Sequence, residues 1–148
     1  MIRFAENKDI GALSKLDSHI SAEELLNSVR LLRVIVRVEN GRLLGWLRYG
    51  LFWDNIPFMN MLYVIDGERG KGIGTALADF WENEMRKNGH ALALASTLSN
   101  ERGQFFFRGR GYGDCGSLIL PNEVTEIIMY KELEDGNGRN MDKNVQRG

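Results

Sequence analysis

The stretch Met61-Leu-Tyr-Val-Ile-Asp-Gly-Glu-Arg-Gly-Lys-Gly-Ile-Gly-Thr-Ala-Leu77 indicates how this chain folds. An apolar run over residues 60–65 predicts a buried strand, and helical periodicity begins at Thr75. Between them lie an acidic turn at 66–68 and a glycine-rich segment at 69–74. A glycine-rich turn between a strand and a helix exposes backbone N–H groups at the positive end of the helix dipole. We therefore expect this turn to bind an anion, most readily a phosphate.

Three phosphate-binding motifs compete for the glycine-rich turn. A Walker A loop requires Gly-Lys-Ser/Thr, but Gly72 follows Lys71 here. A dinucleotide fingerprint fits poorly, because Leu77 stands at its third glycine position and the next predicted strand carries no carboxylate. The third motif, Arg/Gln-x-x-Gly-x-Gly/Ala, is matched by Arg69, Gly72 and Gly74. If the segment is considered alone, a plain glycine-rich turn without a ligand stays an alternative.

The composition predicts one globular domain that is not a nucleic-acid-binding or membrane protein. The chain has 148 residues, 43% of them apolar and 26% charged, which suffices for a single core. Its net charge of −1 differs from the strongly basic footprint of nucleic-acid binding. No apolar run approaches the roughly 18 residues of a membrane span, and the N-terminus lacks the apolar segment of a signal peptide.

The few thiol and imidazole side chains point to a cytoplasmic protein without a metal site. Cys115 is the single cysteine, so an internal disulfide cannot form, and a reducing compartment is expected. The two histidines, His19 and His90, have no metal-ligand spacing with it or with each other. We therefore expect no metal.

Periodicity and turn residues predict the element order β-α-α-β-β-β-α-β-α-β-β. Ser21 and Glu24 form a capping-box sequence, and Asn40-Gly41 is typical of a type I′ hairpin turn. From Glu134 onward no periodicity remains, so a single domain at 1–133 and a disordered polar tail at 134–148 are expected. The expected strands lie at 2–5, 33–39, 43–51, 60–65, 91–97, 114–120 and 125–130, and the expected helices at 8–16, 22–29, 75–87 and 101–110. Helical spacing places Leu16, Leu26 and the three phenylalanines at 105–107 on the inner faces of these helices.

The glycine motif and the element order together resemble the GNAT superfamily, the acyl-CoA-dependent N-acyltransferases. A second segment, residues 99–112, is similar to that family's Asn-x-x-Ala-x-x-Phe-Tyr-x-x-x-Gly-Phe motif and begins with Asn100. Gly103 stands where alanine is usual, and Tyr112 where phenylalanine is usual. The resemblance covers residues 2–133 and implies an α/β (α+β) GNAT fold, a mixed central sheet of about seven strands flanked by helices.

The resemblance implies acetyl-CoA as the co-substrate. Its pyrophosphate would lie on the backbone N–H groups of the glycine turn, with Arg69 and Lys71 nearby. Leu62 and Val64 would hydrogen-bond the pantetheine arm through their backbone, and that stretch would also offer an N–H to the thioester oxygen. The cofactor-binding residues that the resemblance implies are Leu62, Val64, Arg69, Gly70, Lys71, Gly72, Ile73, Gly74, Thr75, Asn100 and Phe107.

The acid and base of the implied reaction are harder to assign. An amine must lose its proton before it attacks, and the leaving thiolate gains from a proton donor. Phe107 stands where the family usually has a tyrosine donor, which leaves Tyr63, Tyr112, Cys115 or a water as candidates. Asp54 is the carboxylate to test first as the base, although Asp-Asn before Ile-Pro is also ordinary turn chemistry.

We therefore expect an N-acetyltransferase that moves acetyl from acetyl-CoA to a primary amine, on a small molecule or a peptide, by direct attack. The alternative is a non-catalytic acyl-CoA-binding or sensor module, because Phe107 cannot donate a proton and the strand before Asn100 carries no carboxylate. Acceptor specificity should lie at 17–30 and 52–58. The sequence leaves open the acceptor and the oligomeric state, a homodimer included.

Overall fold

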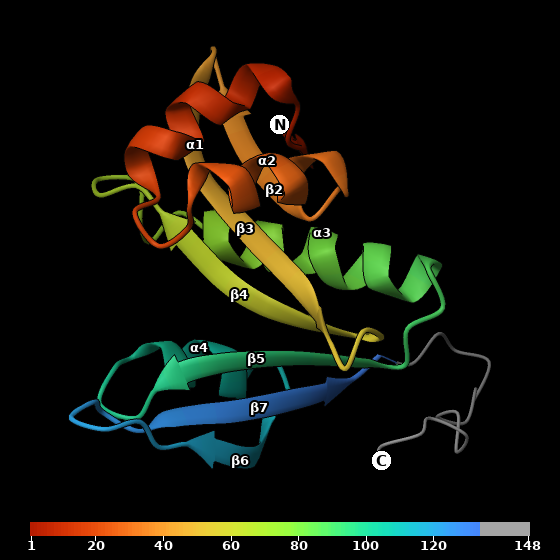
Figure 1. The fold of residues 1–148 in the computed structure, drawn as a ribbon, viewed down its shortest axis with the longest axis vertical. Helices are drawn as coiled ribbons and strands as arrows, with labels where there is room; N and C mark the ends of the chain where they lie inside the picture. The colour runs from red at the N-terminus through yellow and green to blue at the C-terminus, as the bar shows by residue number, and fades with distance from the viewer. Residues whose placement is uncertain (134–148) are drawn as a thin grey trace. The chain divides into compact units, whose positions relative to one another are not determined.

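The computed structural model describes residues 1–133, so the tail predicted at 134–148 lies outside the described residues. Within them, seven strands form one mixed sheet in the order β1-β2-β3-β4-β5-β7-β6 (Figure 1). The predicted fold class, a mixed sheet of seven strands flanked by helices, is confirmed. The strands are β1 (Ile2–Phe4), β2 (Val34–Glu39), β3 (Arg42–Phe52), β4 (Ile56–Val64), β5 (Leu92–Leu98), β6 (Gly113–Leu118) and β7 (Glu126–Glu132), and the helices are η1 (Asn7–Asp9, 3₁₀), α1 (Ile10–Leu16), α2 (Ala22–Arg30), α3 (Ile73–Lys87) and α4 (Gly103–Gly109).

The largest difference from the sequence-based boundaries lies between β3 and β4. A loop was expected over 52–57, but β3 runs to Phe52 and β4 already begins at Ile56. Trp53 and Asp54 turn the chain within a few residues, because both take left-handed backbone angles, with φ of 53° and 63°. The long strands β3 and β4 are therefore joined by a tight hairpin turn rather than by a loop.

The described chain forms two compact units, and each is described by itself. The first comprises Met1–Gly50 with Asn60–Asn83, and the second comprises Leu51–Met59 with the chain from Glu84 onward. The boundaries fall inside the long elements β3, β4 and α3. The expectation of a single domain therefore stays a prediction.

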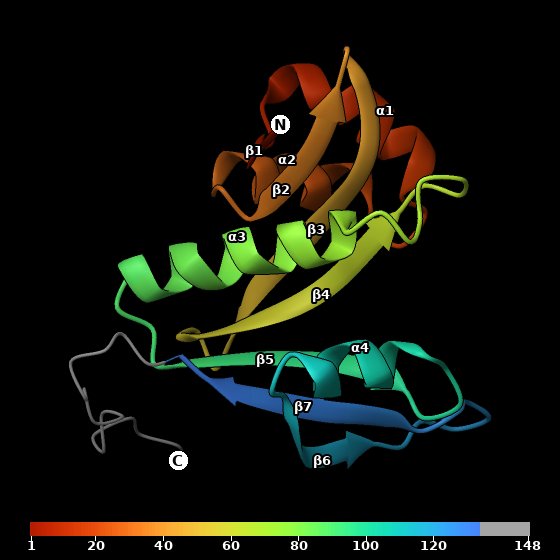
Figure 2. The same ribbon diagram turned by 180° about the vertical axis from the view of Figure 1, so that it is seen from behind.

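In the first unit, β1, β2 and β3 form an antiparallel meander with helices on both faces. β1 pairs with β2, and β2 pairs with β3 across the predicted hairpin turn, where Asn40 and Gly41 have φ of 51° and 76°. Helices α1 and α2 lie on one face, and α3 lies on the other (Figures 1 and 2). The core on the α1 and α2 face consists of Ala5, Leu13, Leu25, Val29, Val34, Val36 and Trp46.

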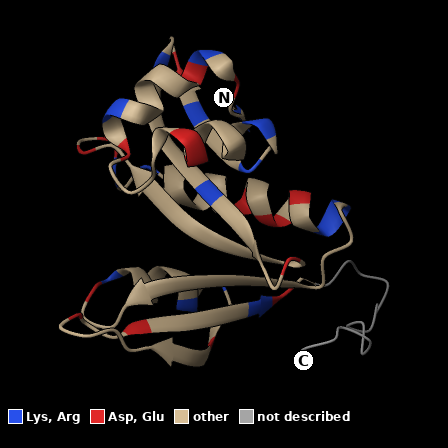
Figure 3. Cartoon of the chain, in the orientation of Figure 1, with Lys and Arg blue, Asp and Glu red and all other residues tan. Residues whose placement is uncertain are grey.

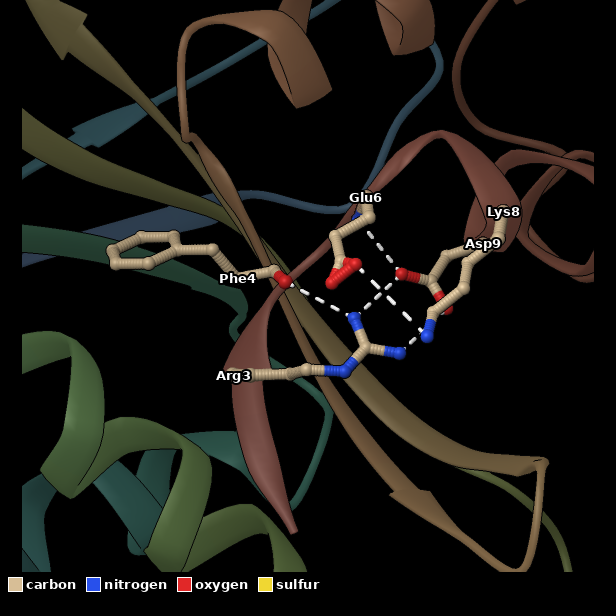
Figure 4. A network of polar contacts seen from close by, with 5 residues as sticks. All are labelled: Arg3, Phe4, Glu6, Lys8 and Asp9. Carbon is tan, nitrogen blue, oxygen red and sulfur yellow. Dashed lines mark hydrogen bonds and ion pairs between the residues drawn. The ribbon is translucent and has the colours of Figure 1, made fainter.

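An ion pair ties the end of β1 to the first helical turn. Arg3 donates from both terminal nitrogens to the Asp9 carboxylate, at 2.7 and 3.0 Å (Figure 4). The same carboxylate accepts the backbone N–H of Glu6 at 2.7 Å. This bond satisfies the backbone donor at the N-cap of η1, so the helical region begins at Asn7 and not at Lys8.

A second, deeper carboxylate lies between α1 and β3. Asp17 is 3% exposed and ends α1, and its Oδ2 accepts from Arg48 Nε at 2.7 Å and from Trp46 Nε1 at 3.0 Å. Its Oδ1 accepts the backbone N–H of His19 at 3.1 Å. Burial by itself raises the pKa of Asp17, but the bonds from Arg48 and His19 outweigh it and hold the pKa below its ordinary value.

In the second unit, β5 lies between β4 and β7. β5 pairs in parallel with β4 at Phe58↔Leu94 and Met59↔Ala95, as the predicted strand-helix-strand crossover requires. It pairs antiparallel with β7, whose other edge carries β6. Helix α4 contacts β5, and the Cβ of an alanine at Gly103 would lie 2.8 Å from Thr97 Oγ1. Position 103 therefore cannot hold the usual alanine without a shift.

Three apolar side chains that helical spacing placed in the core are exposed. Phe105 was expected to pack inward with Phe106 and Phe107, but it is 62% exposed, while Phe107 is 6% exposed. Leu16 and Leu26, counted on the inner faces of their helices, are also exposed. Neighbouring residues on a helix point about 100° apart, so Leu26 and Phe105 turn away from the faces that bury Leu25 and Phe107. No helix of the described chain is long and apolar enough to cross a bilayer.

The lowered pKa values of Asp9 and Asp17 predict that the free energy of unfolding falls in acid. The hydrogen bond from Arg3 holds the pKa of Asp9 below its ordinary value, as Arg48 does for Asp17. This stabilisation is fully present above the unfolded pKa of about 3.9 and is lost as the pH falls through the lowered folded values. In urea unfolding from pH 6 to pH 2.5, we expect a shallower loss in Asp9→Asn than in the wild type. Equal acid dependence of the two proteins would contradict this role of Asp9.

Candidate functional site

The glycine-rich turn lies entirely in the first unit and joins β4 to α3. The loop over residues 65–72 begins where Ile65 donates its N–H to the Leu44 carbonyl at 2.9 Å, which extends the contact of β4 with β3. Gly67, Gly70 and Gly72 have φ of 89°, 79° and 82°, and a Cβ on any of them would meet nothing within 4 Å. The glycines are therefore required for backbone conformation, not for lack of space.

The loop ends at a helix start whose backbone donors are available. Ala76 donates its N–H to the Gly72 carbonyl at 3.0 Å, which is the first helical hydrogen bond of α3. The N–H groups of Ile73, Gly74 and Thr75 precede that bond and therefore lack a partner inside the helix. α3 is 15 residues long, so its full dipole acts at this end. This is the geometry that binds phosphate groups.

The two predicted cations lie beside these donors, but each is already paired. Lys71 Nζ lies 3.0 Å from Glu68 Oε2, and its hydrogen bond and charge lower the pKa of that carboxyl. Arg69 lies 3.2 Å from Asp66 and donates from Nε to the Val64 carbonyl at 3.0 Å. The loop side chains therefore have no net formal charge (Figure 3).

These pairs can open at small cost when an anion arrives. The side chains of Arg69 and Lys71 are 58% and 60% exposed, and exposed ion pairs contribute roughly 0–1 kcal/mol. The backbone N–H groups supply the fixed part of an anion site, and the two cations supply an adjustable part. Arg69 also lies over the Tyr63 ring, with Cζ 5.2 Å from the ring centroid.

Residues 62–64 form the end of β4 that leads into the loop. Leu62, Tyr63 and Val64 are half-buried, and the Tyr63 ring lies 4.9 Å from Trp46 on the α1 and α2 face. Because Arg69 occupies the Val64 carbonyl, the pantetheine contact expected at Val64 would use its N–H or the second lone pair of its oxygen. The first unit thus brings together the site residues predicted from Leu62 to Thr75.

Gly45, in the middle of β3, was not singled out from the sequence, yet it supports this whole region. A Cβ there would lie 2.8 Å from the Tyr63 carbonyl oxygen, 3.2 Å from Ile73 Cγ2 and 3.3 Å from Leu77 Cδ1. The missing side chain lets β4 and the first turn of α3 approach β3 closely. A glycine inside an apolar strand pattern was the signal that could have indicated it.

The remaining predicted residues lie in the second unit. Asn100 is exposed in the turn after β5, and Phe107 is buried with its ring 5.3 Å from both Phe106 and Tyr112. Asp54 is exposed in the left-handed hairpin turn. This turn gives a conformational reason for an aspartate at position 54 that is independent of catalysis.

The other candidates for proton transfer and metal binding are placed as follows. Tyr112 is buried under Lys131, whose Nζ lies 5.7 Å from the ring centroid. Cys115 is exposed on β6, where partial desolvation and the charge of Asp114 raise the pKa of its thiol. Over residues 1–133, no three His, Cys, Asp or Glu side chains gather in a way that could hold a metal ion.

The model of the acetyltransferase (GNAT) family matches residues 7–112, well over half of the chain. The match includes the whole β4–loop–α3 segment and the segment from Asn100 to Tyr112. No curated protein sequence matches this chain.

Several solved acetyltransferase structures are similar to this one. The ribosomal-protein-alanine N-acetyltransferase from Brucella melitensis is 20% identical, with a TM-score of 0.77 over 90% of this chain and 99% of that chain. The protein yncA from Salmonella typhimurium, solved with its cofactor acetyl-CoA, is 18% identical, with a TM-score of 0.76 over 95% and 97%. An aminoglycoside 6′-N-acetyltransferase complexed with coenzyme A is 20% identical, with a TM-score of 0.76 over 90% and 97%. At these identities the similarity shows the fold.

The close approach at Gly45 gives a prediction for stability. Gly45→Ala should lower the free energy of unfolding by roughly 1–3 kcal/mol, because its Cβ pushes on the backbone of Tyr63 and on Ile73. Gly11→Ala is the matched control. Gly11 lies in α1, a Cβ at this position would meet nothing within 4 Å, and alanine favours a helix. Urea unfolding of both variants measures the difference. Equal stability of the two variants would contradict the close approach.

Proposed function

This chain belongs to the acetyltransferase (GNAT) family, and we propose on that basis that it is an N-acetyltransferase acting on a primary amine. The observation that carries the proposal is the β4–loop–α3 segment, with free N–H groups at Ile73–Thr75 above a turn of three left-handed glycines. The pyrophosphate of acetyl-CoA fits this set of donors. Two of the similar structures contain acetyl-CoA or coenzyme A, which supports the same co-substrate here.

The proposed reaction is direct transfer. The neutral amine nitrogen attacks the thioester carbonyl carbon, a C–N bond forms, and the C–S bond breaks. Backbone N–H groups of the Leu62–Val64 stretch would stabilise the oxyanion that forms in between. The sulfur leaves as the CoA thiolate, and the nitrogen loses a proton to a base or to water. With a thiol pKa of about 8.5, the thiolate can leave without a strong acid.

The proposal assigns proton transfer to groups other than Phe107. Phe107 is buried against Tyr112 and Phe106 and offers no hydroxyl. Tyr63 lies on β4 beside Arg69 and is the proposed donor on that strand. Asp54 precedes β4, whose residues rise about 3.3 Å each, so an acyl group held at Leu62–Val64 would lie roughly 20 Å or more from Asp54 along the strand. We therefore propose water, and not Asp54, as the acceptor of the amine proton.

The proposed acceptor is an amine. The similar structures include a ribosomal-protein-alanine acetyltransferase and an aminoglycoside acetyltransferase, whose substrates differ in size and charge. We place the reaction in the cytoplasm, with neither nucleic acid nor membrane as partner. A net charge of −1 supports this part of the proposal.

Release of thiol from acetyl-CoA over a panel of amines and N-terminal peptides tests the proposal. Gly72→Glu should abolish turnover and acetyl-CoA binding, because it places a carboxylate where the pyrophosphate is expected and strains a backbone with φ of 82°. Gly41→Glu is the matched control. Its position has φ of 76° and equally open surroundings but lies in the β2–β3 turn, so it should keep full turnover.

Each outcome separates the proposal from its alternative. Turnover in the wild type and in Gly41→Glu, but not in Gly72→Glu, supports the enzyme. Tight acetyl-CoA binding without turnover of any amine favours the non-catalytic sensor, for which the buried Phe107 is the supporting observation. No binding of acetyl-CoA by the wild type would contradict both functions.

A further inference from the structure

Arg48 on β3 is a buried cation whose terminal nitrogens are unoccupied. The residue is 7% exposed, and its side chain is 8% exposed. Within residues 1–133, its hydrogen bond is the one from Nε to Asp17 Oδ2 at 2.7 Å. The fully enclosed polar atoms that lack a partner in the described chain are Arg37 Nε and Trp81 Nε1. Both terminal nitrogens of Arg48 therefore still reach accessible space.

Asp17 fixes the orientation of this guanidinium. Its carboxylate is fully buried and accepts from three donors, Arg48 Nε, Trp46 Nε1 and the backbone N–H of His19. These bonds hold Asp17 on the Nε edge of Arg48 and leave the edge formed by its two terminal nitrogens open. The remaining N–H groups of a buried guanidinium bond to protein acceptors or to ordered water. Because no acceptor of residues 1–133 lies at this edge of Arg48, a ligand can take the place of water there.

The position of Arg48 is next to the stretch of β4 assigned to acyl transfer. On β3, Trp46 lies beside Tyr63, with ring centroids 4.9 Å apart, and a Cβ on Gly50 would lie 3.2 Å from Asn60 Nδ2. Arg48 lies between these two positions, so it is level with Met61 and Leu62 on β4. It shares a face with Trp46, because side chains two apart on a strand point the same way. That is the face covered by α1 and α2, where acceptor specificity was expected.

The chemistry of the open edge selects a carboxylate. Two parallel N–H groups of a guanidinium match the two oxygens of a carboxylate, and such paired, charge-assisted bonds are among the strongest in proteins. The neighbouring charge of Asp17 partly offsets that of Arg48, which suits a monoanion better than a phosphate dianion. The side chain of Arg48 is 8% exposed, so only a small part of it is open to a ligand.

We infer that Arg48 binds the carboxylate of the acceptor, so that the substrate is an amine that also carries a carboxylate, as a free amino acid does. Asp17 is the positioning residue that holds the guanidinium in place. This inference rests on the proposed acetyl transfer and names its substrate class. The carboxylate binds at Arg48 on β3, and the amine reaches the thioester carbonyl at β4, the neighbouring strand.

Arg48→Lys tests the inference, because lysine keeps a cation against Asp17 but cannot present two parallel N–H groups. Acetylation is measured for pairs of acceptors, α- and ω-amino acids and their carboxamides. The wild type should have the higher kcat/KM for the carboxylate member. Arg48→Lys should lower the carboxylate-to-amide ratio roughly 10- to 100-fold, as expected for the loss of a charge-assisted hydrogen bond. The KM for acetyl-CoA should stay within about twofold.

Matched controls separate recognition from folding. Arg37→Lys changes another strand arginine that pairs with a carboxylate, Glu39, and should leave the ratio unchanged. If Arg48→Lys fails to fold, the assay uses the double variant Asp17→Asn, Arg48→Gln in its place, because this variant removes both buried charges together. If the role of Arg48 is only structural, Arg48→Lys would change the melting temperature and leave the carboxylate-to-amide ratio of kcat/KM unchanged. That result would overturn the inference. Equal acetylation of acids and amides by the wild type would also overturn it.

A binding measurement makes failure of the inference distinguishable from failure of the proposed function. N-acetylated amino acids, in the presence of CoA, should raise the melting temperature of the wild type, whereas their amides should not. The shift should vanish in Arg48→Lys. A shift with this pattern but no turnover of any amine would contradict the enzyme and keep the carboxylate site. A shift from CoA alone, with no effect of any carboxylate, would overturn the site and keep CoA binding.

Discussion

The candidate site depends on one close approach, made at a position where β3 has no side chain. At Gly45 the backbone of β4 and the first turn of α3 come so near to β3 that a single Cβ would lie 2.8 Å from the Tyr63 oxygen. The same contact sets the positions of the end of β4, the start of the loop and the first turn of α3. The three left-handed glycines then need only to turn the chain between two elements that β3 already holds. The free N–H groups at Ile73–Thr75 follow from this arrangement.

The two anion sites proposed in the first unit would bind in different ways. At the loop, the fixed donors are backbone N–H groups, and the side-chain charges of Asp66, Glu68, Arg69 and Lys71 cancel. Such a site is adjustable, because exposed ion pairs contribute little and can exchange partners. At Arg48 the donor is a charged side chain, held rigid by a buried carboxylate. Moving a buried charge is costly, so this second site selects by geometry.

The sequence predicted most elements because their local patterns are strong. The Asn40-Gly41 turn has the expected positive φ angles, and Ser21 accepts the backbone N–H of Glu24 as its capping sequence indicated. Ile73, Leu77, Trp81 and Met85 are buried at helical spacing along α3. Two predictions were wrong because the local sequence pattern fits more than one structure. Trp53-Asp54 forms a two-residue left-handed turn although neither residue is glycine, and Phe105 begins the apolar run 105–107 but is exposed.

The sequence by itself determined the seven-stranded α/β fold, the position of the glycine turn between a strand and a helix, and the family to which the chain belongs. Periodicity, turn residues and motif spacing are local properties, and local properties can be read along a chain. Only the tertiary structure decided that Arg69 and Lys71 are paired, that Gly45 supports the loop, and that Asp17 meets Arg48. The last two contacts join residues 18 and 31 positions apart. No local pattern encodes which side chains meet across strands and helices, because packing of the whole core sets those distances.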